Sequence, residues 1–163
     1  MTAQLSCSSI LPLCDNCGKE KIKTINEEFR QGSKTKLKPM LIIISTPIGN
    51  LGDITQRAAH MLAHADIIAC EDTRQTRKLL SLLSISSSAE LWAYHDHNGA
   101  KQRPKLINAM RAGQQVALAS DAGTPLISDP GYKLVTACLE NDIPVTTAPG
   151  PTAPIVALSL IHI

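Results

Sequence analysis

Five short apolar runs alternate with longer amphipathic segments over residues 41–148 of this 163-residue chain. The runs have the length of buried strands, and the segments between them have the apolar spacing of helices. We expect strands at residues 41–45, 66–70, 90–94, 115–119 and 144–148, and helices at about 53–64, 73–83, 100–112 and 131–140. Strands that alternate with helices form βαβ units, whose right-handed crossovers make the strands parallel. The sequence therefore predicts an α/β fold, a parallel-stranded open sheet with helices on both faces.

The chain before residue 40 differs from the rest in composition and charge. Residues 1–39 lack sustained periodicity and mix Ser, Lys, Gln, Gly and Pro. This composition is typical of segments that cannot bury enough surface to fold. Residues 1–40 hold seven of the 16 Lys and Arg and four of the 14 Asp and Glu, so the basic excess lies there. We interpret residues 1–39 as a flexible leader and residues 40–152 as one domain. Met40 is a candidate alternative translation start, which N-terminal sequencing of the native protein would decide.

Two loops rich in Gly, Pro and Asp follow the first and fourth predicted strands, at residues 45–53 and 120–131. Ligands of open α/β sheets bind at the carboxyl ends of the strands, so two such loops suggest a binding site more than two ordinary turns. The first loop lacks the glycine spacing of dinucleotide-binding folds and the G-K-[ST] of a P-loop. It offers a rigid proline, two glycines, and Asp53, which we expect to cap the next helix.

The second loop places Asp121 at the tip of a strand, beside small residues. A carboxylate in that place can hold a ligand amine or a ribose hydroxyl, and the alternative is an Asx interaction that stabilises the turn. Asp129, followed by Pro130, is interpreted as the structural cap of the next helix.

Charged and imidazole side chains also follow the second and third strands, at 71–74 (Glu-Asp-Thr-Arg) and 95–98 (His-Asp-His-Asn). Carboxylates, imidazoles and an arginine at one edge can support general base catalysis or phosphate contact. The alternative is that Asp72 or Thr73 caps a helix and that residues 95–98 form a solvated loop.

Cysteine and histidine usage does not support a metal site. The five cysteines are odd in number, and two lie in predicted core elements, which fits a reducing cytosol. Cys14 and Cys17 have zinc-knuckle or redox spacing, but no second pair follows, and His95 and His97 have no third ligand at a recognisable spacing. We therefore expect no metal.

The apolar stretch 5–13 is too short and too interrupted to span a membrane. No Lys or Arg precedes it, which argues against a secretory signal. With the cysteine usage, this predicts a cytoplasmic protein.

Five motifs in order carry a family resemblance: residues 41–55, 71–74, 95–98, 120–132 and 149–153. Together they resemble the tetrapyrrole methylase superfamily, and within it the ribosomal RNA small subunit methyltransferase I branch. The resemblance covers about residues 41–159. It implies transfer of a methyl group from S-adenosyl-L-methionine to a cytidine ribose 2′-hydroxyl in small-subunit rRNA, and a homodimer in the full-length protein. Residues 40–152 then correspond to an N-terminal methylase domain.

The resemblance also implies roles for individual residues. It places the cofactor against nine residues of two loops and the last predicted strand: Pro47, Asp121, Ala122, Gly123, Thr124, Pro125, Leu126, Ser128 and Thr147. It assigns catalysis or RNA contact to Glu71, Arg74, His95 and Asn98. Among these last, one carboxylate or imidazole is the expected acceptor of the ribose hydroxyl proton.

Family members have a second α/β domain after this one, with the cofactor between the two. We interpret residues 153–163 as the truncated start of the connection to it, and expect the chain alone to bind the cofactor poorly and to methylate nothing. One alternative is a methylase of the same superfamily acting on a porphyrin or corrin precursor. Another is a non-catalytic nucleotide-binding or assembly module, which the missing phosphate fingerprint disfavours.

Overall fold

The computed structural model describes residues 39–126 and 131–161, in which five parallel strands form one open sheet. The strand order is β3-β2-β4-β1-β5. The strands are β1 Leu41–Ile44, β2 Ile67–Cys70, β3 Glu90–Ala93, β4 Val116–Ala119 and β5 Val145–Ala148. The last residues of neighbouring strands are paired with one another across the whole sheet, so all five following loops start level at one edge.

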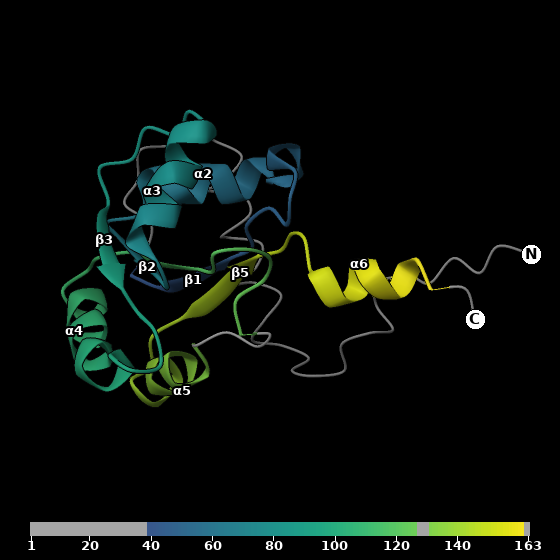
Figure 1. Cartoon of the computed structure of the whole chain (residues 1–163). Helices are drawn as coiled ribbons and strands as arrows, with labels where there is room; N and C mark the ends of the chain where they lie inside the picture. The colour runs from purple at the N-terminus through teal and green to yellow at the C-terminus, as the bar shows by residue number, and fades with distance from the viewer. Residues whose placement is uncertain (1–38, 127–130, 162–163) are drawn as a thin grey trace, which may run out of the picture. The chain divides into compact units, whose positions relative to one another are not determined.

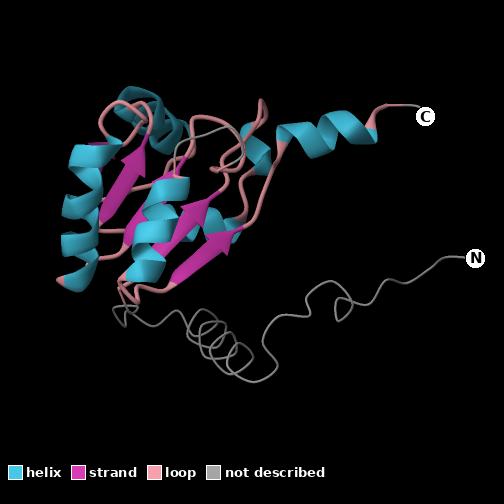
Figure 2. Ribbon diagram, turned by 90° about the horizontal axis from the view of Figure 1, so that it is seen from below, coloured by secondary structure: helices cyan, strands magenta, loops and turns pink. Residues whose placement is uncertain are grey.

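Two helices cover each face of the sheet (Figure 1). The helices α2 Gln56–His64 and α3 Thr73–Leu82 lie on one face, and α4 Gly99–Arg111 and α5 Tyr132–Glu140 on the other. The chain moves outward from β1 to β3 and then returns to β4 and β5, and right-handed crossovers in opposite directions place helices on opposite faces. Figure 2 shows the same layers from below. A last helix, α6 Ala153–Ser159, follows β5 and holds no buried residue.

The core forms where the three inner strands are buried on both faces. Every residue of β1, β2 and β4 is buried, because helices cover both sides of the sheet. Leu41, Val116 and Leu118 pack with Leu106 and Leu134 of α4 and α5. Each such side chain contributes about 1.5–3 kcal/mol relative to remaining exposed. The predicted α/β fold class is therefore confirmed, with every expected strand present.

The first helix begins later than the sequence predicts. A short 3-10 helix, η2 Leu51–Asp53, precedes it, and the Asn50 side chain closes that turn by accepting from the Gly52 N–H. Thr55 then caps α2, its hydroxyl accepting from the N–H of Ala58 at 3.1 Å. The expectation that Asp53 caps this helix is wrong, because η2 ends at Asp53 and the chain is extended again at Ile54.

Several expectations fall outside the described residues. The leader does so except for Pro39, as do Cys14, Cys17, Ser128 and Asp129. The domain boundaries at residues 40 and 152 stay predictions. Cys70 and Cys138 are buried free thiols, as their place in core elements predicts, and burial raises the pKa of Cys138 to about 11. In residues 39–126 and 131–161, none of the helices combines the length and the apolar character that a membrane span needs.

Candidate active site

The loops after β1 and β4 are hydrogen-bonded to each other. The Thr46 N–H donates to the Gly123 carbonyl at 2.8 Å, and the Gly123 N–H donates back to the Thr46 carbonyl at 3.1 Å. The buried Thr46 hydroxyl donates to the Ser120 carbonyl at 3.1 Å. These two strands are neighbours in the sheet, and their helices lie on opposite faces. Such a reversal is where open α/β sheets form their ligand crevice.

A single hydroxyl joins the loop after β5 to the other two. Thr124 Oγ1 donates to the Pro151 carbonyl at 2.9 Å. It lies 2.9 Å from Ser45 Oγ and 2.9 Å from Thr152 Oγ1, and accepts from both, because a hydroxyl has one donor and two acceptor positions. We call residues 45–47, 120–124 and 148–152 the loop junction. Its polar groups hold the three loops together.

Two glycines let the backbones of the loop junction approach this closely. Gly123 has a φ of +85°, which residues with a Cβ rarely adopt. A Cβ added there would lie 3.3 Å from Ile48 Cγ2. An added Cβ at Gly150 would lie 2.9 Å from the Ser45 Cβ. The glycines after β4 and β5 are therefore required by packing at this edge.

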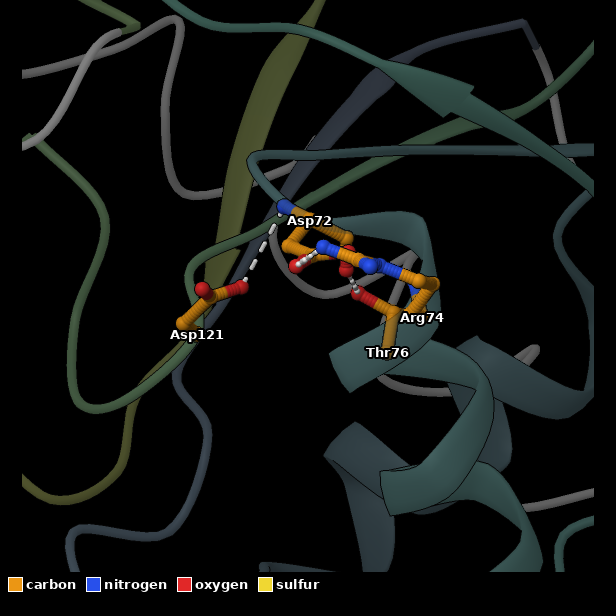
Figure 3. Close-up of polar contacts among 4 residues, drawn as sticks. All are labelled: Asp72, Arg74, Thr76 and Asp121. Carbon is orange, nitrogen blue, oxygen red and sulfur yellow. Dashed lines mark hydrogen bonds and ion pairs between the residues drawn. The ribbon is translucent and has the colours of Figure 1, made fainter.

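Asp121 lies at the end of β4 and reaches toward the neighbouring strand β2. Its carboxylate accepts from the Asp72 N–H at 3.4 Å, as Figure 3 shows. The side chain is exposed, and no N–H of its own turn donates to it in the part of the chain that the structure describes. The Asx alternative thus has no support here, and the carboxylate keeps acceptor positions for a ligand.

The segment after β2 is organised by Asp72. Its Oδ1 accepts from the Arg74 N–H at 2.8 Å and caps α3, and its Oδ2 lies 3.2 Å from Arg74 Nη2. Thr76 completes the turn by donating to the Asp72 carbonyl at 3.2 Å (Figure 3). Hydrogen bonds from Arg74 hold the pKa of Asp72 below its ordinary value. The capping alternative is thus confirmed for Asp72, and the Arg74 side chain is 87% exposed. Glu71 is exposed beside it.

The segment after β3 is held by Asn98. The His95 N–H donates to Asn98 Oδ1 at 2.9 Å, and Asn98 Nδ2 donates to the Ala93 carbonyl at 2.9 Å. The rings of His95 and His97 meet edge to face, with centroids 6.0 Å apart. Nowhere in the described ranges do three or more His, Cys, Asp or Glu side chains gather closely enough to hold a metal ion.

The residues proposed to contact the cofactor fall into exposed and buried groups. Asp121, Ala122 and Thr147 are exposed; Thr124 and Leu126 are half-buried; Pro47, Gly123 and Pro125 are buried. The exposed group lies at the ends of β4 and β5, which flank β1 in the sheet, while the buried group lies within the loops. Sequence reasoning missed Arg57, whose Nη2 donates to the Thr147 carbonyl at 2.8 Å from α2. Nothing in the spacing of residues 56–64 marks that contact, because it joins segments 90 residues apart.

The fold and the loop junction define an α/β domain whose loops after β1, β4 and β5 meet at the carboxyl edge of the sheet, the edge where open α/β sheets bind ligands. The chain belongs to the Tetrapyrrole (Corrin/Porphyrin) Methylases, whose family model matches residues 40–163.

Its relatives include proteins named "Ribosomal RNA small subunit methyltransferase I". That of Mesorhizobium japonicum is 54% identical over 123 residues, which cover 76% of this chain and 41% of the relative. That of Vibrio cholerae is 54% identical over 121 residues, covering 74% of this chain and 41% of the relative. The chain thus spans about two-fifths of the length of these relatives.

Solved structures share the fold at low sequence identity. A uroporphyrin-III C-methyltransferase from Thermus thermophilus, complexed with S-adenyl homocysteine, has a TM-score of 0.57 at 21% identity. The match covers 76% of this chain and 54% of that one. At this identity the likeness confirms the parallel α/β architecture.

Proposed function

We propose that this chain forms the cofactor-side domain of an S-adenosyl-L-methionine-dependent methyltransferase that acts on a cytidine ribose 2′-hydroxyl of small-subunit rRNA. The observation that carries the proposal is the 54% identity to rRNA small subunit methyltransferase I of Mesorhizobium japonicum, which runs through the domain that holds the loop junction. The resemblance of the motifs at residues 71–74 and 95–98 to the rRNA branch supports it against a tetrapyrrole substrate.

The exposed part of the site fits the proposed cofactor. Asp121 offers free carboxylate acceptor positions, which suit the ammonium or the ribose hydroxyls of S-adenosyl-L-methionine. Ala122 and Thr147 are exposed, and Arg57 fixes the Thr147 backbone. When bound, S-adenosyl-L-methionine supplies a methyl group on a sulfonium that an oxygen nucleophile can attack. We assign the buried Pro47, Gly123 and Pro125 to shaping the loops that carry these groups.

We assign the remaining candidates to orienting and deprotonating the ribose hydroxyl. Glu71 and His95 follow β2 and β3, whose last residues are paired at the same level of the sheet. We propose that one of them accepts the hydroxyl proton, because a ribose hydroxyl is a poor nucleophile while protonated. Arg74 is proposed to contact RNA, and Asn98, whose carboxamide is bonded on both sides, positions His95. Most of the rate enhancement is expected from holding the reacting atoms in line.

We further propose that the protein acts in the cytoplasm on the small ribosomal subunit and forms a homodimer in its full-length form. Exposed apolar side chains support a protein contact on two helices: Leu139 of α5 and Ile155, Val156 and Leu158 of α6. Sedimentation of the complete gene product would report the dimer.

A chimera tests the proposed reaction. Residues 40–152 of this chain replace the matching region of the Vibrio cholerae relative, in cells that lack their own enzyme. We expect 2′-O-methylcytidine to return to small-subunit rRNA, as measured by mass spectrometry of rRNA nucleosides. Asp121→Asn should abolish this, while Asp142→Asn, an exposed control outside the loops of the site, should not. A folded chimera that methylates a tetrapyrrole but not rRNA would overturn the proposal.

A further inference from the structure

A small cavity lies between the end of β3 and the first turns of α4 and α5, apart from the loop junction. Its volume is about 160 Å³, and the polar residues that line it are Tyr94, His95, Asp96, Arg103, Tyr132 and Lys133. Pockets for whole small molecules have about 300–1,000 Å³. The size therefore suits a single functional group of a larger ligand.

Arg103 of α4 lines this cavity, and one of its donors is unused. Its Nε is fully buried and has no hydrogen-bond partner, and it is the only buried side-chain nitrogen or oxygen in this state among the described residues. Native proteins satisfy nearly all buried polar atoms, and an arginine has five donors and no acceptor. The missing partner must therefore be an acceptor, and for a guanidinium the strongest acceptors are carboxylates and phosphates.

The amino ends of α4 and α5 both open on the same cavity. Gly99 and Ala100 begin α4, and Gly131 and Tyr132 begin α5, and all four line it. Neither helix has a side-chain cap: Asn98 uses its carboxamide within its own turn, and Gly131 has no side chain. The dipoles of two such helix ends add positive potential to the charge of Arg103. The Gly99 N–H is already bonded to the His95 carbonyl at 2.8 Å, so this potential comes from the helix ends as a whole.

The lining charges favour an anion as well. Two cations, Arg103 and Lys133, line the cavity together with one carboxylate, that of the exposed Asp96. Tyr132 beside them is 74% exposed, so its ring is available on the surface. An exposed ring next to an anion site suits a nucleotide, whose base stacks on the ring while its phosphate is held.

We propose that this cavity binds a phosphodiester of the RNA substrate, held by Arg103 and Lys133 and by the amino ends of α4 and α5, with the adjacent base on Tyr132. This inference rests on the proposed function for the identity of the ligand. His95 lines this cavity and is one of the two proposed proton acceptors. A phosphate fixed here therefore sets the position of the ribose that enters the site.

Phosphate binding by the full chain tests the site independently of methyl transfer. Inorganic phosphate is titrated into the ¹⁵N-labelled chain, and the amide signals of Gly99, Ala100, Gly131 and Tyr132 and the Arg103 Nε–H signal are followed. We expect saturable shifts at these positions. Arg103→Gln should weaken binding by about tenfold or more, because it removes a charge-assisted bond. The exposed Lys133→Gln should weaken it by about two- to fivefold.

Lys105→Gln is the matched control, since Lys105 is an exposed cation of α4 that does not line the cavity. It should change phosphate affinity by less than about twofold. Shifts that do not saturate, or an equal loss in Lys105→Gln and Lys133→Gln, would overturn the site. If Arg103→Gln fails to fold, the comparison of Lys133→Gln with Lys105→Gln still tests the site.

A single-stranded RNA oligonucleotide then identifies the source of the phosphate. The slope of log affinity against log salt should fall by about 0.7 in each cavity variant, and not in the Lys105→Gln control. S-adenosyl-L-methionine binding should be equal in all of them. Phosphate binding without any RNA preference would overturn the RNA assignment, and loss of rRNA methylation in the chimera with phosphate binding intact would count against the proposed function alone.

Discussion

The loop junction and the outer loops, residues 71–74 and 95–98, lie on one edge of the sheet but are built differently. At the loop junction Ser45, Thr46 and Ser120 are buried, and hydroxyls bond three segments together. In the outer loops Glu71, Arg74 and His97 are exposed, and each loop is held mainly by one side chain of its own segment. The difference separates a tightly bonded support from loops whose side chains remain exposed to solvent.

A Gly→Ala substitution should destabilise the protein more in the loop junction than in a turn with a similar φ. We expect Gly123→Ala to cost about 2–4 kcal/mol, from a strained positive φ and the contact with Ile48. Gly113→Ala is the control, because its φ is +95° but nothing lies within 4 Å of an added Cβ. It should cost about 1–2 kcal/mol. Urea unfolding at pH 7 measures both, and equal costs would show that the junction is not tightly packed.

Removing one buried hydroxyl should also weaken the loop junction. Thr46→Val leaves the Ser120 carbonyl without this donor in a buried place, and should cost about 1–3 kcal/mol. Thr136→Val removes a similar bond, to the Tyr132 carbonyl, from the exposed side of α5. Its cost should stay within about 0.5 kcal/mol. The comparison fails if the two free energies of unfolding change alike.

In the outer loop after β2, Asp72 should stabilise the protein only while its carboxylate is ionised. The pKa of Asp72 is lowered in the folded state by hydrogen bonds from Arg74, so its contribution is present above the unfolded pKa and lost as pH falls through the folded one. We expect Asp72→Asn to lower the melting temperature at pH 7 and the difference to vanish below the ordinary value of 3.8. Glu140→Gln, an exposed charge change on α5, is the control and should lower the melting temperature at pH 7 by less than Asp72→Asn does. A constant deficit at all pH values would contradict the assignment.

The smallest effect on stability is expected at His97. Its side chain is exposed and contacts the ring of His95, so His97→Ala should change the free energy of unfolding by no more than about 0.5 kcal/mol. Chemical denaturation of the variant beside the wild type measures this. A loss above 1 kcal/mol, roughly the typical cost of a point substitution, would place His97 in the support of the loop.

The fold was predictable because each strand is a continuous apolar run, which buried parallel strands require. The order of the strands was not predictable. The four residues of β1 and the four of β4 are all apolar, so neither strand shows which neighbours it pairs with. Which loops lie together at the carboxyl edge was also predictable, because parallel strands end at the same edge. The partners of Asp72, Asn98 and Thr124 depend on side-chain direction at strand ends, and Asp53 was misplaced because Asn50 and Thr55 offer competing caps.

The central place of β1 has a consequence for the order in which the protein can fold. Its two neighbours in the sheet, β4 and β5, are both synthesised later, and the bond between Thr46 and Gly123 closes a separation of 77 residues. Pairings so distant in sequence form slowly, because the entropy of the intervening chain opposes them. During synthesis the apolar β1 therefore remains unpaired until residues beyond 119 have left the ribosome. For that interval it is exposed to aggregation with other chains.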